Sequence, residues 1–203
     1  VLTNCTIEGN KNHCCGGGIY VDASPAVVTN CKILNNSTWY LDGDGDPAGH
    51  AGGGMYISNY DGPSATITGC TVQGNRARNY GGGLRLSGGK ITVTDCLVAE
   101  NTVDEDGGGV YADDGELRFV NCTIRDNRTE EKGGGIYVDD STTLENCIIR
   151  DNHAEENGGG VYVYDECTFI GGMLFDNTSE EAGDDLWQDT DDPRSIYSTQ
   201  GAR

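Results

Sequence analysis

Pairs of acidic residues recur along the second half of the chain, and each pair is followed two residues later by a glycine. The pairs are Asp104 with Glu105, Glu130 with Glu131, Glu155 with Glu156, and Glu180 with Glu181. In a stacked repeat, equivalent carboxylates lie about 5 Å apart, so they repel one another and attract counter-ions. Because oxygen ligands suit calcium, the pattern predicts a calcium-binding edge. The alternative is a solvated charged edge that resists pairing with other sheets.

A second acidic motif, Asp-Gly-Asp-Gly-Asp, lies in the first half of the chain. Its alternate acids are Asp42, Asp44 and Asp46, a spacing that lets several carboxylates converge on one hard cation. The motif departs from the EF-hand loop, because Pro47 stands where that loop requires glycine and Gly53 where it requires a glutamate. The segment is a candidate calcium loop, and a flexible Asp-Gly loop is the alternative.

Extra residues interrupt the regular spacing around the same segment. The distance from cysteine to the following glycines is 21 residues after Cys31 and 11 elsewhere, and a shorter insertion follows Ile57. Both insertions flank one strand, so we expect them to project from one side and to frame a cleft. The candidate ligand-binding residues are Trp39, Tyr40 and His50 in the longer insertion and Tyr60 and Asp61 in the shorter one. The rings of Trp39 and Tyr40 suit stacking on carbohydrate, with a small loop core of their own as the alternative.

These residues are carried by a repeat that runs the length of the chain: a cysteine, an asparagine five residues later, glycines, and an apolar–aromatic–apolar triplet. Six copies start at Cys5, Cys31, Cys70, Cys96, Cys122 and Cys147, and Gly172 stands in the place of a seventh cysteine. The asparagines are Asn10, Asn36, Asn75, Asn101, Asn127, Asn152 and Asn177. The last four intervals are 26, 26, 25 and 25 residues, and a short fixed period indicates stacked units rather than one globular core.

The repeat predicts strands rather than helices. Within each copy apolar residues alternate with polar ones, and 32 of the 203 residues are glycine. We therefore predict an all-β fold, a right-handed parallel β-helix (β-solenoid) of about seven coils with about 25 residues per coil. Residues 1–188 form the repeats, with an inserted loop at 37–51, and residues 189–203 form a C-terminal cap or a docking tail.

Stacking of equivalent residues gives each column a predicted role. The asparagines form a hydrogen-bonded ladder at the turn, and the cysteines form an inward ladder of buried thiols. Disulfides within the column are an alternative, because the Cα atoms of adjacent cysteines lie within the range that a disulfide tolerates. Zinc is disfavoured, because the column supplies no His ligands. Cys14 and Cys15 occupy an exposed turn, where they form a strained disulfide or reach a neighbour. The outward aromatic column is expected to stack, with Arg85 packed on its rings: Tyr20, Tyr56, Tyr111, Tyr137, Tyr162 and Trp187.

The motif Cys-x-Ile-x-x-Asn followed by Gly-Gly-Gly-Ile-Tyr resembles the short repeats of polymorphic outer-membrane proteins and related bacterial surface β-helices. The resemblance covers about residues 1–188. It implies a β-helix exposed at a bacterial surface, and it is specific for fold rather than for function. The membrane-spanning β-barrel that such proteins often carry is not part of this sequence, so the resemblance does not imply autotransport.

Composition restricts the partners. The 33 acidic and 13 basic residues give a net charge of −20, which disfavours nucleic acid and anionic membranes, and no long apolar run predicts membrane insertion. Solubility or a saline habitat also explains this charge. We expect an extracellular or cell-surface structural or adhesive protein, not an enzyme, whose open first coil promotes end-to-end self-association into a filament or surface layer. The alternatives are a β-helix that binds or cleaves polysaccharide and, more remotely, a threonine-rich ice-binding face.

Overall fold

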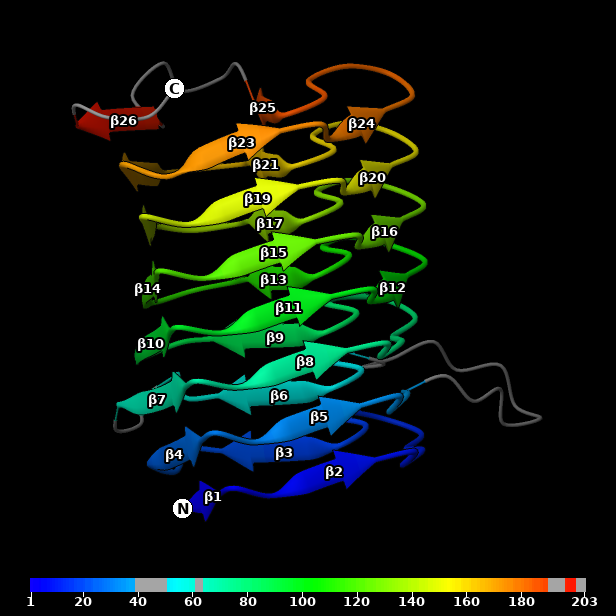
Figure 1. The fold of residues 1–203 in the computed structure, drawn as a ribbon, viewed down its shortest axis with the longest axis vertical. Coiled ribbons are helices and arrows are strands. Elements are labelled where there is room, and N and C mark those ends of the chain that lie inside the picture. The colour runs from blue at the N-terminus through cyan, green and yellow to red at the C-terminus, as the bar shows by residue number, and fades with distance from the viewer. Residues whose placement is uncertain (39–50, 61–63, 190–195, 200–203) are drawn as a thin grey trace.

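The computed structural model describes residues 1–38, 51–60, 64–189 and 196–199. In these residues the chain consists of short strands and turns, without a helix, and it winds upward as a rod of stacked coils (Figure 1). The N-terminus lies at one end of the rod and strand β26 at the other. The right-handed parallel β-helix of about seven coils is therefore confirmed.

Four parallel sheets run along the rod, and each coil contributes one short strand to each sheet that it reaches. Sheet 1 contains β1 (Leu2–Thr3), β4 (Ala26–Thr29), β7 (Ala65–Thr68), β10 (Lys90–Thr94), β14 (Glu116–Val120), β18 (Thr142–Glu145), β22 (Cys167–Ile170) and β26 (Ile196–Thr199). Sheet 2 contains β2 (Thr6–Glu8), β5 (Lys32–Leu34), β8 (Thr71–Gln73), β11 (Leu97–Ala99), β15 (Thr123–Arg125), β19 (Ile148–Arg150) and β23 (Met173–Phe175).

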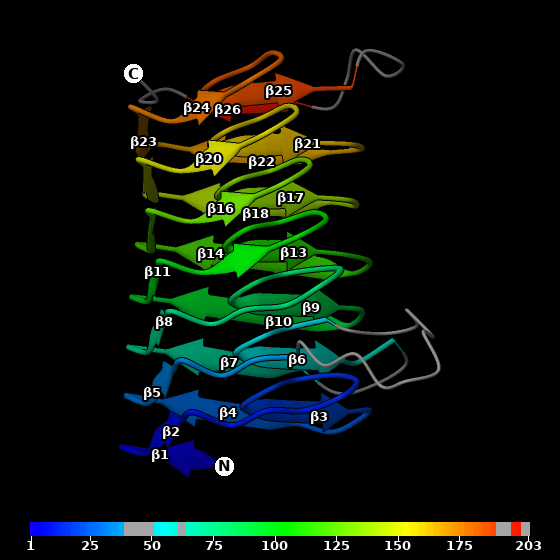
Figure 2. The same ribbon diagram turned by 90° about the vertical axis from the view of Figure 1, so that its right-hand side faces the viewer.

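The other two sheets complete each turn of the rod (Figure 2). Sheet 3 is the short one, with β12 (Thr102–Val103), β16 (Arg128–Thr129), β20 (His153–Ala154) and β24 (Thr178–Ser179). Sheet 4 contains β3 (Ile19–Asp22), β6 (Met55–Ser58), β9 (Leu84–Ser87), β13 (Val110–Ala112), β17 (Ile136–Val138), β21 (Val161–Val163) and β25 (Leu186–Gln188). We number the coils 1 to 7 by their sheet 4 strands, from β3 to β25.

The strands pair in strict register, so each residue lies above its equivalent in the coil below. Val93 pairs with Phe119, and Phe119 pairs with Leu144, all three in the buried column of sheet 1. Ile124 of sheet 2 and Ile136 of sheet 4 are fully buried on the other sides of the same core. Stacking like on like gives one continuous apolar core along the rod.

The three glycines of each repeat have different roles. The first takes a left-handed conformation, as Gly107 does with φ +76°, which residues with a Cβ resist. The second lies against the backbone of the next coil, because a Cβ on Gly108 would come 2.3 Å from the carbonyl oxygen of Gly134. A Cβ on the third, Gly109, would lie 2.9 Å from the side-chain nitrogen of Asn127. Positive φ therefore explains the first glycine, and close approach of neighbouring groups explains the other two.

The predicted asparagine ladder is confirmed. The Nδ2 of Asn75 donates to Oδ1 of Asn101 at 3.0 Å and to the carbonyl oxygen of Ile33 at 2.9 Å. The backbone N–H of Asn75 donates to the same Oδ1 at 2.9 Å. This pattern repeats from coil to coil, and the buried members are Asn36, Asn75, Asn101, Asn127, Asn152 and Asn177. The Asn75 side chain thus satisfies two backbone groups of the coil below, a carbonyl and an N–H, and bonds to the amide of the coil above.

The cysteine column is a ladder of reduced thiols. The N–H of Cys70 donates to Sγ of Cys96 at 3.3 Å, and that thiol donates to the carbonyl oxygen of Thr94 at 3.2 Å. All nine cysteines lie among the described residues, and none forms a disulfide. Cys5, in coil 1, is partly buried, while the other five thiols of the column are buried in the core: Cys31, Cys70, Cys96, Cys122 and Cys147.

The upper end of the rod carries groups that take the place of a further coil. Oδ1 of Asp185 accepts hydrogen bonds from the side chain and the N–H of Asn177, at 2.9 and 3.3 Å, where another asparagine would otherwise continue the ladder. Strand β26 pairs in parallel with β22 and extends sheet 1. Part of the predicted tail therefore lies on the chain's own last coil.

Candidate functional site

The acidic columns lie in the turns between sheet 3 and sheet 4, and basic residues from the coil below approach them. Arg76 forms an ion pair with Asp104 at 3.2 Å, and Arg128 forms one with Glu155 at 2.5 Å. All four side chains are partly exposed, so each pair stabilises the fold by at most about 1 kcal/mol. Charges from a neighbouring column therefore offset part of the expected repulsion at Asp104 and Glu155.

The second column of acids is held in part by amides. The Nδ2 of Asn79 donates to Glu105 at 2.6 Å, and the Nδ2 of Asn157 donates to Glu181 at 3.4 Å. Lys132 lies 3.8 Å from the carboxylate of Glu156. These contacts place the acids along the rod rather than around one point.

A metal ion would need several of these ligands to converge. In the part of the chain that the structure describes, no three His, Cys, Asp or Glu side chains form a group that could hold a metal ion. Calcium binding by the two columns stays a prediction. The other predicted calcium ligands, Asp42, Asp44 and Asp46, lie outside the described residues.

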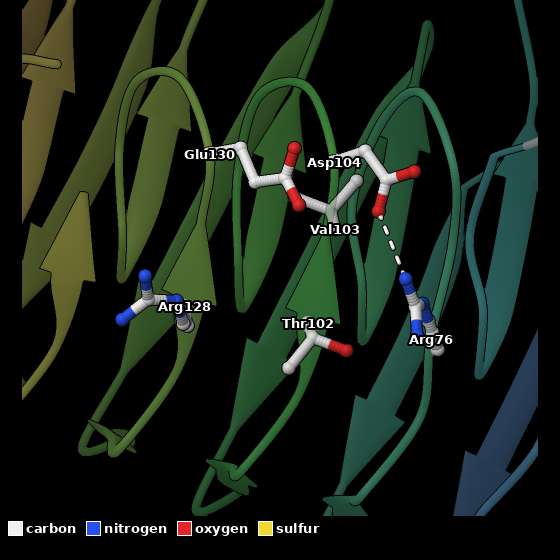
Figure 3. A pocket seen from close by; sticks show the side chains of 6 residues that line it. All are labelled: Arg76, Thr102, Val103, Asp104, Arg128 and Glu130. Atoms are coloured by element: carbon white, nitrogen blue, oxygen red, sulfur yellow. Dashed lines mark hydrogen bonds and ion pairs between the residues drawn. The ribbon is translucent and has the colours of Figure 1, made fainter. Parts of the chain in front are cut away.

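A groove of about 190 Å³ runs across sheet 3 beside these turns (Figure 3). It is lined by Arg76, Thr102, Val103, Asp104, Arg128 and Glu130. Arg76 and Arg128 stand on either side of Thr102, two coils and therefore roughly 10 Å apart. The carboxylates of Asp104 and Glu130 lie beside this row, on the turns that follow sheet 3. The groove thus presents a row of cationic and hydroxyl groups beside a row of anionic groups, and both rows follow the rod.

The sequence indicated the two acids of the groove but not its basic side. Arg76, Thr102, Arg128 and His153 follow one another in the outward column of sheet 3. In the sequence, this column can be identified as the position directly after each ladder asparagine. It was hard to recognise, because this column is not of one residue type.

Asp106, in the turn of coil 4, has the most perturbed carboxyl group of these turns. Its partial burial, reinforced by the negative charge of Glu131, raises its pKa to about 7. The backbone N–H of Lys132 donates to its Oδ1 at 3.1 Å and opposes the rise, as does the charge of that lysine. The folded protein therefore holds a proton on Asp106 at pH values where the unfolded chain has released it.

Asp106→Asn is expected to stabilise the protein at pH 8 by about 1–2 kcal/mol and to have little effect near pH 4. The folded-state pKa lies above the unfolded value, so wild-type stability falls as pH rises from about 4 to about 7. Asparagine keeps the acceptor for the Lys132 N–H and removes that loss. Urea unfolding at several pH values measures the effect, with the exposed Asp114→Asn as control. Equal gains at pH 4 and pH 8 would contradict the explanation.

The predicted aromatic stack is present on the outer side of sheet 4, but its middle part is covered. The rings of Tyr111 and Tyr137 lie 4.9 Å apart and nearly parallel, and Tyr162 continues the stack at 4.9 Å. Residues of the turns fold back over these rings: Tyr80 lies 4.7 Å from Tyr111, and Nζ of Lys132 lies 5.5 Å from the Tyr162 ring. The three stacked tyrosines are consequently buried, in a second apolar cluster outside sheet 4.

Arg85 replaces a tyrosine in this column, and its predicted cation–π packing is confirmed. Its guanidinium lies 4.9 Å from the ring of Tyr56, 5.0 Å from Tyr80 and 5.7 Å from Tyr111. It also forms a largely buried ion pair with Asp113 at 3.2 Å. The charge is therefore enclosed by rings and neutralised by one carboxylate.

Tyr60, the one predicted ligand-binding residue that the structure describes, contacts Asp113, the ion-pair partner of Arg85. Its hydroxyl donates to Asp113 at 3.2 Å, and Oγ of Ser87 lies 2.7 Å from the Tyr60 oxygen and 2.8 Å from the carboxylate. Burial alone would raise the pKa of Asp113, but its hydrogen bonds, above all the one from Ser87, and the Arg85 guanidinium hold it below its usual value. The remaining candidates lie outside the described residues: Trp39, Tyr40, His50 and Asp61.

Comparison with known proteins agrees with this geometry at the level of the fold. A family model described as "Right handed beta helix region" matches residues 1–192. Neither the curated proteins nor the solved structures gave a match. Among the described residues, no helix has the length and apolar character needed to cross a membrane. The match covers most of the chain, and the chain therefore belongs to the right handed beta helix family.

Proposed function

We propose that this chain is a structural or adhesive module of an extracellular or cell-surface assembly, in which it acts as a stiff anionic rod. One observation carries the proposal: the asparagine hydrogen bonds pass without a break from coil 1 to coil 7. Bending or shearing the rod would have to break these buried bonds together with the core register. The surface location also rests on the resemblance to polymorphic outer-membrane proteins.

The charge of the rod is unevenly distributed, which supports a preferred direction of association. The first 100 residues contain eight acidic and six basic residues, whereas residues 101–203 contain 25 acidic and seven basic residues. The lower half is therefore nearly neutral and the upper half strongly negative. Two upper halves repel one another, so contact through the lower coils is electrostatically favoured.

The lower face of coil 1 supplies the contact in this proposal. Strands β1, β2 and β3 pair only with strands of coil 2 in the described structure, so half of their backbone groups face outward. An open edge of parallel strands accepts another coil by strand addition. That coil comes from the same polypeptide or, in end-to-end self-association, from a second copy.

Negative-stain electron microscopy over a range of protein and salt concentrations tests this proposal. We expect rods joined at their ends, and more of them at higher salt, because salt screens the acidic halves. Thr6→Pro is the matched variant: the N–H of Lys32 bonds to the Cys5 carbonyl, so parallel pairing directs the Thr6 N–H to the open side. This variant should fold and remain as single rods. Single rods of wild-type protein at every concentration would contradict self-association.

The groove of Figure 3 supports a second candidate function, the binding of a neutral polysaccharide. Its arginines, hydroxyl and carboxylates provide both donors and acceptors for sugar hydroxyls, in two neighbouring rows that follow the rod. A glycan array with Arg76→Ala tests it, with Arg118→Ala on sheet 1 as control. Loss of a charged hydrogen bond should weaken binding by about tenfold or more for Arg76→Ala alone. Equal binding by both variants would exclude the groove.

A further inference from the structure

The turn of coil 1 differs chemically from the acidic turns above it. Where coils 4 to 7 carry their acid pairs, this turn carries His13 and Cys14, and Cys15 follows. Its backbone is fixed to coil 2, because the Ala51 N–H donates to the Cys14 carbonyl at 3.3 Å and the Gly16 N–H donates to the Ala51 carbonyl at 2.9 Å. The two cysteines are therefore held at a defined place on the surface of the rod.

The thiols of this turn face each other. Sγ of Cys14 and Sγ of Cys15 lie 2.8 Å apart and share a hydrogen bond. Cys14 is exposed and Cys15 partly buried, whereas Cys70, Cys96 and most other cysteines are buried in the core. Cys14 and Cys15 are thus two neighbouring thiols that a reagent in solution can reach.

We propose that Cys14 and Cys15 form a reversible redox pair that closes into a disulfide by exchange with a low-molecular-weight disulfide such as glutathione disulfide. Consecutive Cα atoms are about 3.8 Å apart, which is less than the roughly 4.4–6.8 Å of ordinary disulfides. A bond between neighbours is strained for this reason, and strained, exposed disulfides are readily reduced again. The pair is a labile switchable bond and not a structural cross-link.

The exchange takes place in two steps. The Cys14 thiolate attacks glutathione disulfide, which forms a mixed disulfide and releases one glutathione thiolate. The Cys15 thiolate then attacks the Cys14 sulfur, closes the protein disulfide and releases the second glutathione. The two cysteines lose two electrons and two protons, and the glutathione disulfide is reduced to two thiols.

The surroundings assign the order of the steps. Burial first, and then the hydrogen bond and charge of Cys14, raise the pKa of Cys15 to about 12, while the Arg85 charge lowers it. The exposed Cys14 is therefore the attacking thiol. Once Cys14 carries glutathione, its hydrogen bond and charge no longer disfavour the Cys15 thiolate, so the second step becomes easier.

Reduced protein in buffers of graded glutathione and glutathione disulfide ratio tests the proposal, after alkylation and peptide mass spectrometry. In wild type we expect the peptide that carries both residues to lose two hydrogen atoms, without a lasting glutathione adduct, and to regain them with dithiothreitol. Cys15→Ser should accumulate the adduct on Cys14. Cys14→Ser should form any adduct on Cys15 at least about tenfold more slowly.

Three results would overturn the proposal, provided that circular dichroism shows both variants to be folded. In the first, wild type retains the glutathione adduct on Cys14, as Cys15→Ser does. In the second, wild type resists oxidation at a glutathione ratio that modifies Cys15→Ser. In the third, wild type forms a disulfide between two copies of the chain, seen on a non-reducing gel, instead of the bond within the turn.

Discussion

Gly108→Ala is expected to destabilise the rod by about 3–5 kcal/mol, which approaches the whole stability of an ordinary domain. The added Cβ would lie 2.3 Å from the carbonyl oxygen of Gly134 and 2.8 Å from the carbonyl carbon of Arg128. Both atoms belong to the backbone of coil 5, which is fixed by its own pairing with coil 6, so neither can move aside. Urea unfolding followed by far-ultraviolet circular dichroism measures the loss.

Gly9→Asn is the control for this substitution, because it changes a glycine of the same structure that has no close neighbour. Gly9 has φ +68°, and a Cβ there meets nothing within 4 Å. Asn35 occupies the equivalent position of coil 2 with φ +53°, so asparagine suits this backbone. We expect a change below about 1 kcal/mol. If Gly108→Ala unfolded at the same urea concentration as Gly9→Asn, the explanation of the second glycine by close contact between coils would be wrong.

The fold was predictable because a single period determines it. Once Cys96, Cys122 and Cys147 are aligned, the apolar columns, the asparagine ladder and the parallel pairing follow from stacking alone. What lies over sheet 4 did not follow. The tyrosine column lies on the outer side of sheet 4, as expected, but alternation along a strand gives only the side of the sheet on which a residue lies. Whether a turn covers that side depends on the path of the chain, which brings Tyr80 onto Tyr111.

In the candidate site, the neighbours within one column were predictable, whereas the contacts between columns were not. Alignment identifies Asp104 and Glu130 as neighbours, but it does not show that Arg76 reaches Asp104 from the coil below. In the same way Tyr60 meets Asp113 across 53 positions of sequence. Such contacts depend on side-chain direction and on the width of a turn, neither of which is periodic. They decide the local charge balance, so the sequence alone does not give the net repulsion in the acidic turns.

Asn127 shows how much one member of the buried ladder supports. Its Nδ2 donates to the carbonyl oxygen of Val98 at 3.1 Å and to Oδ1 of Asn152 at 2.9 Å. Its Oδ1 accepts from the N–H and from Nδ2 of Asn101, each at 3.0 Å. Only an amide provides donors on one side and an acceptor on the other, so no other side chain of this size and shape satisfies all these groups.

Asn127→Asp is therefore expected to cost about 4 kcal/mol or more at pH 7, although the two side chains have the same shape. The new oxygen would face two acceptors, those of Val98 and Asn152, in a site that excludes water. Burial would hold the folded-state pKa of the new carboxyl above its unfolded value, so the loss should shrink as pH falls toward 4, where a proton restores one donor. Urea unfolding at pH 4 and pH 7 measures both effects, with the exposed Asn121→Asp of the same coil as control. A loss independent of pH, or one no larger than that of the control, would mean that the ladder does not hold the coils together.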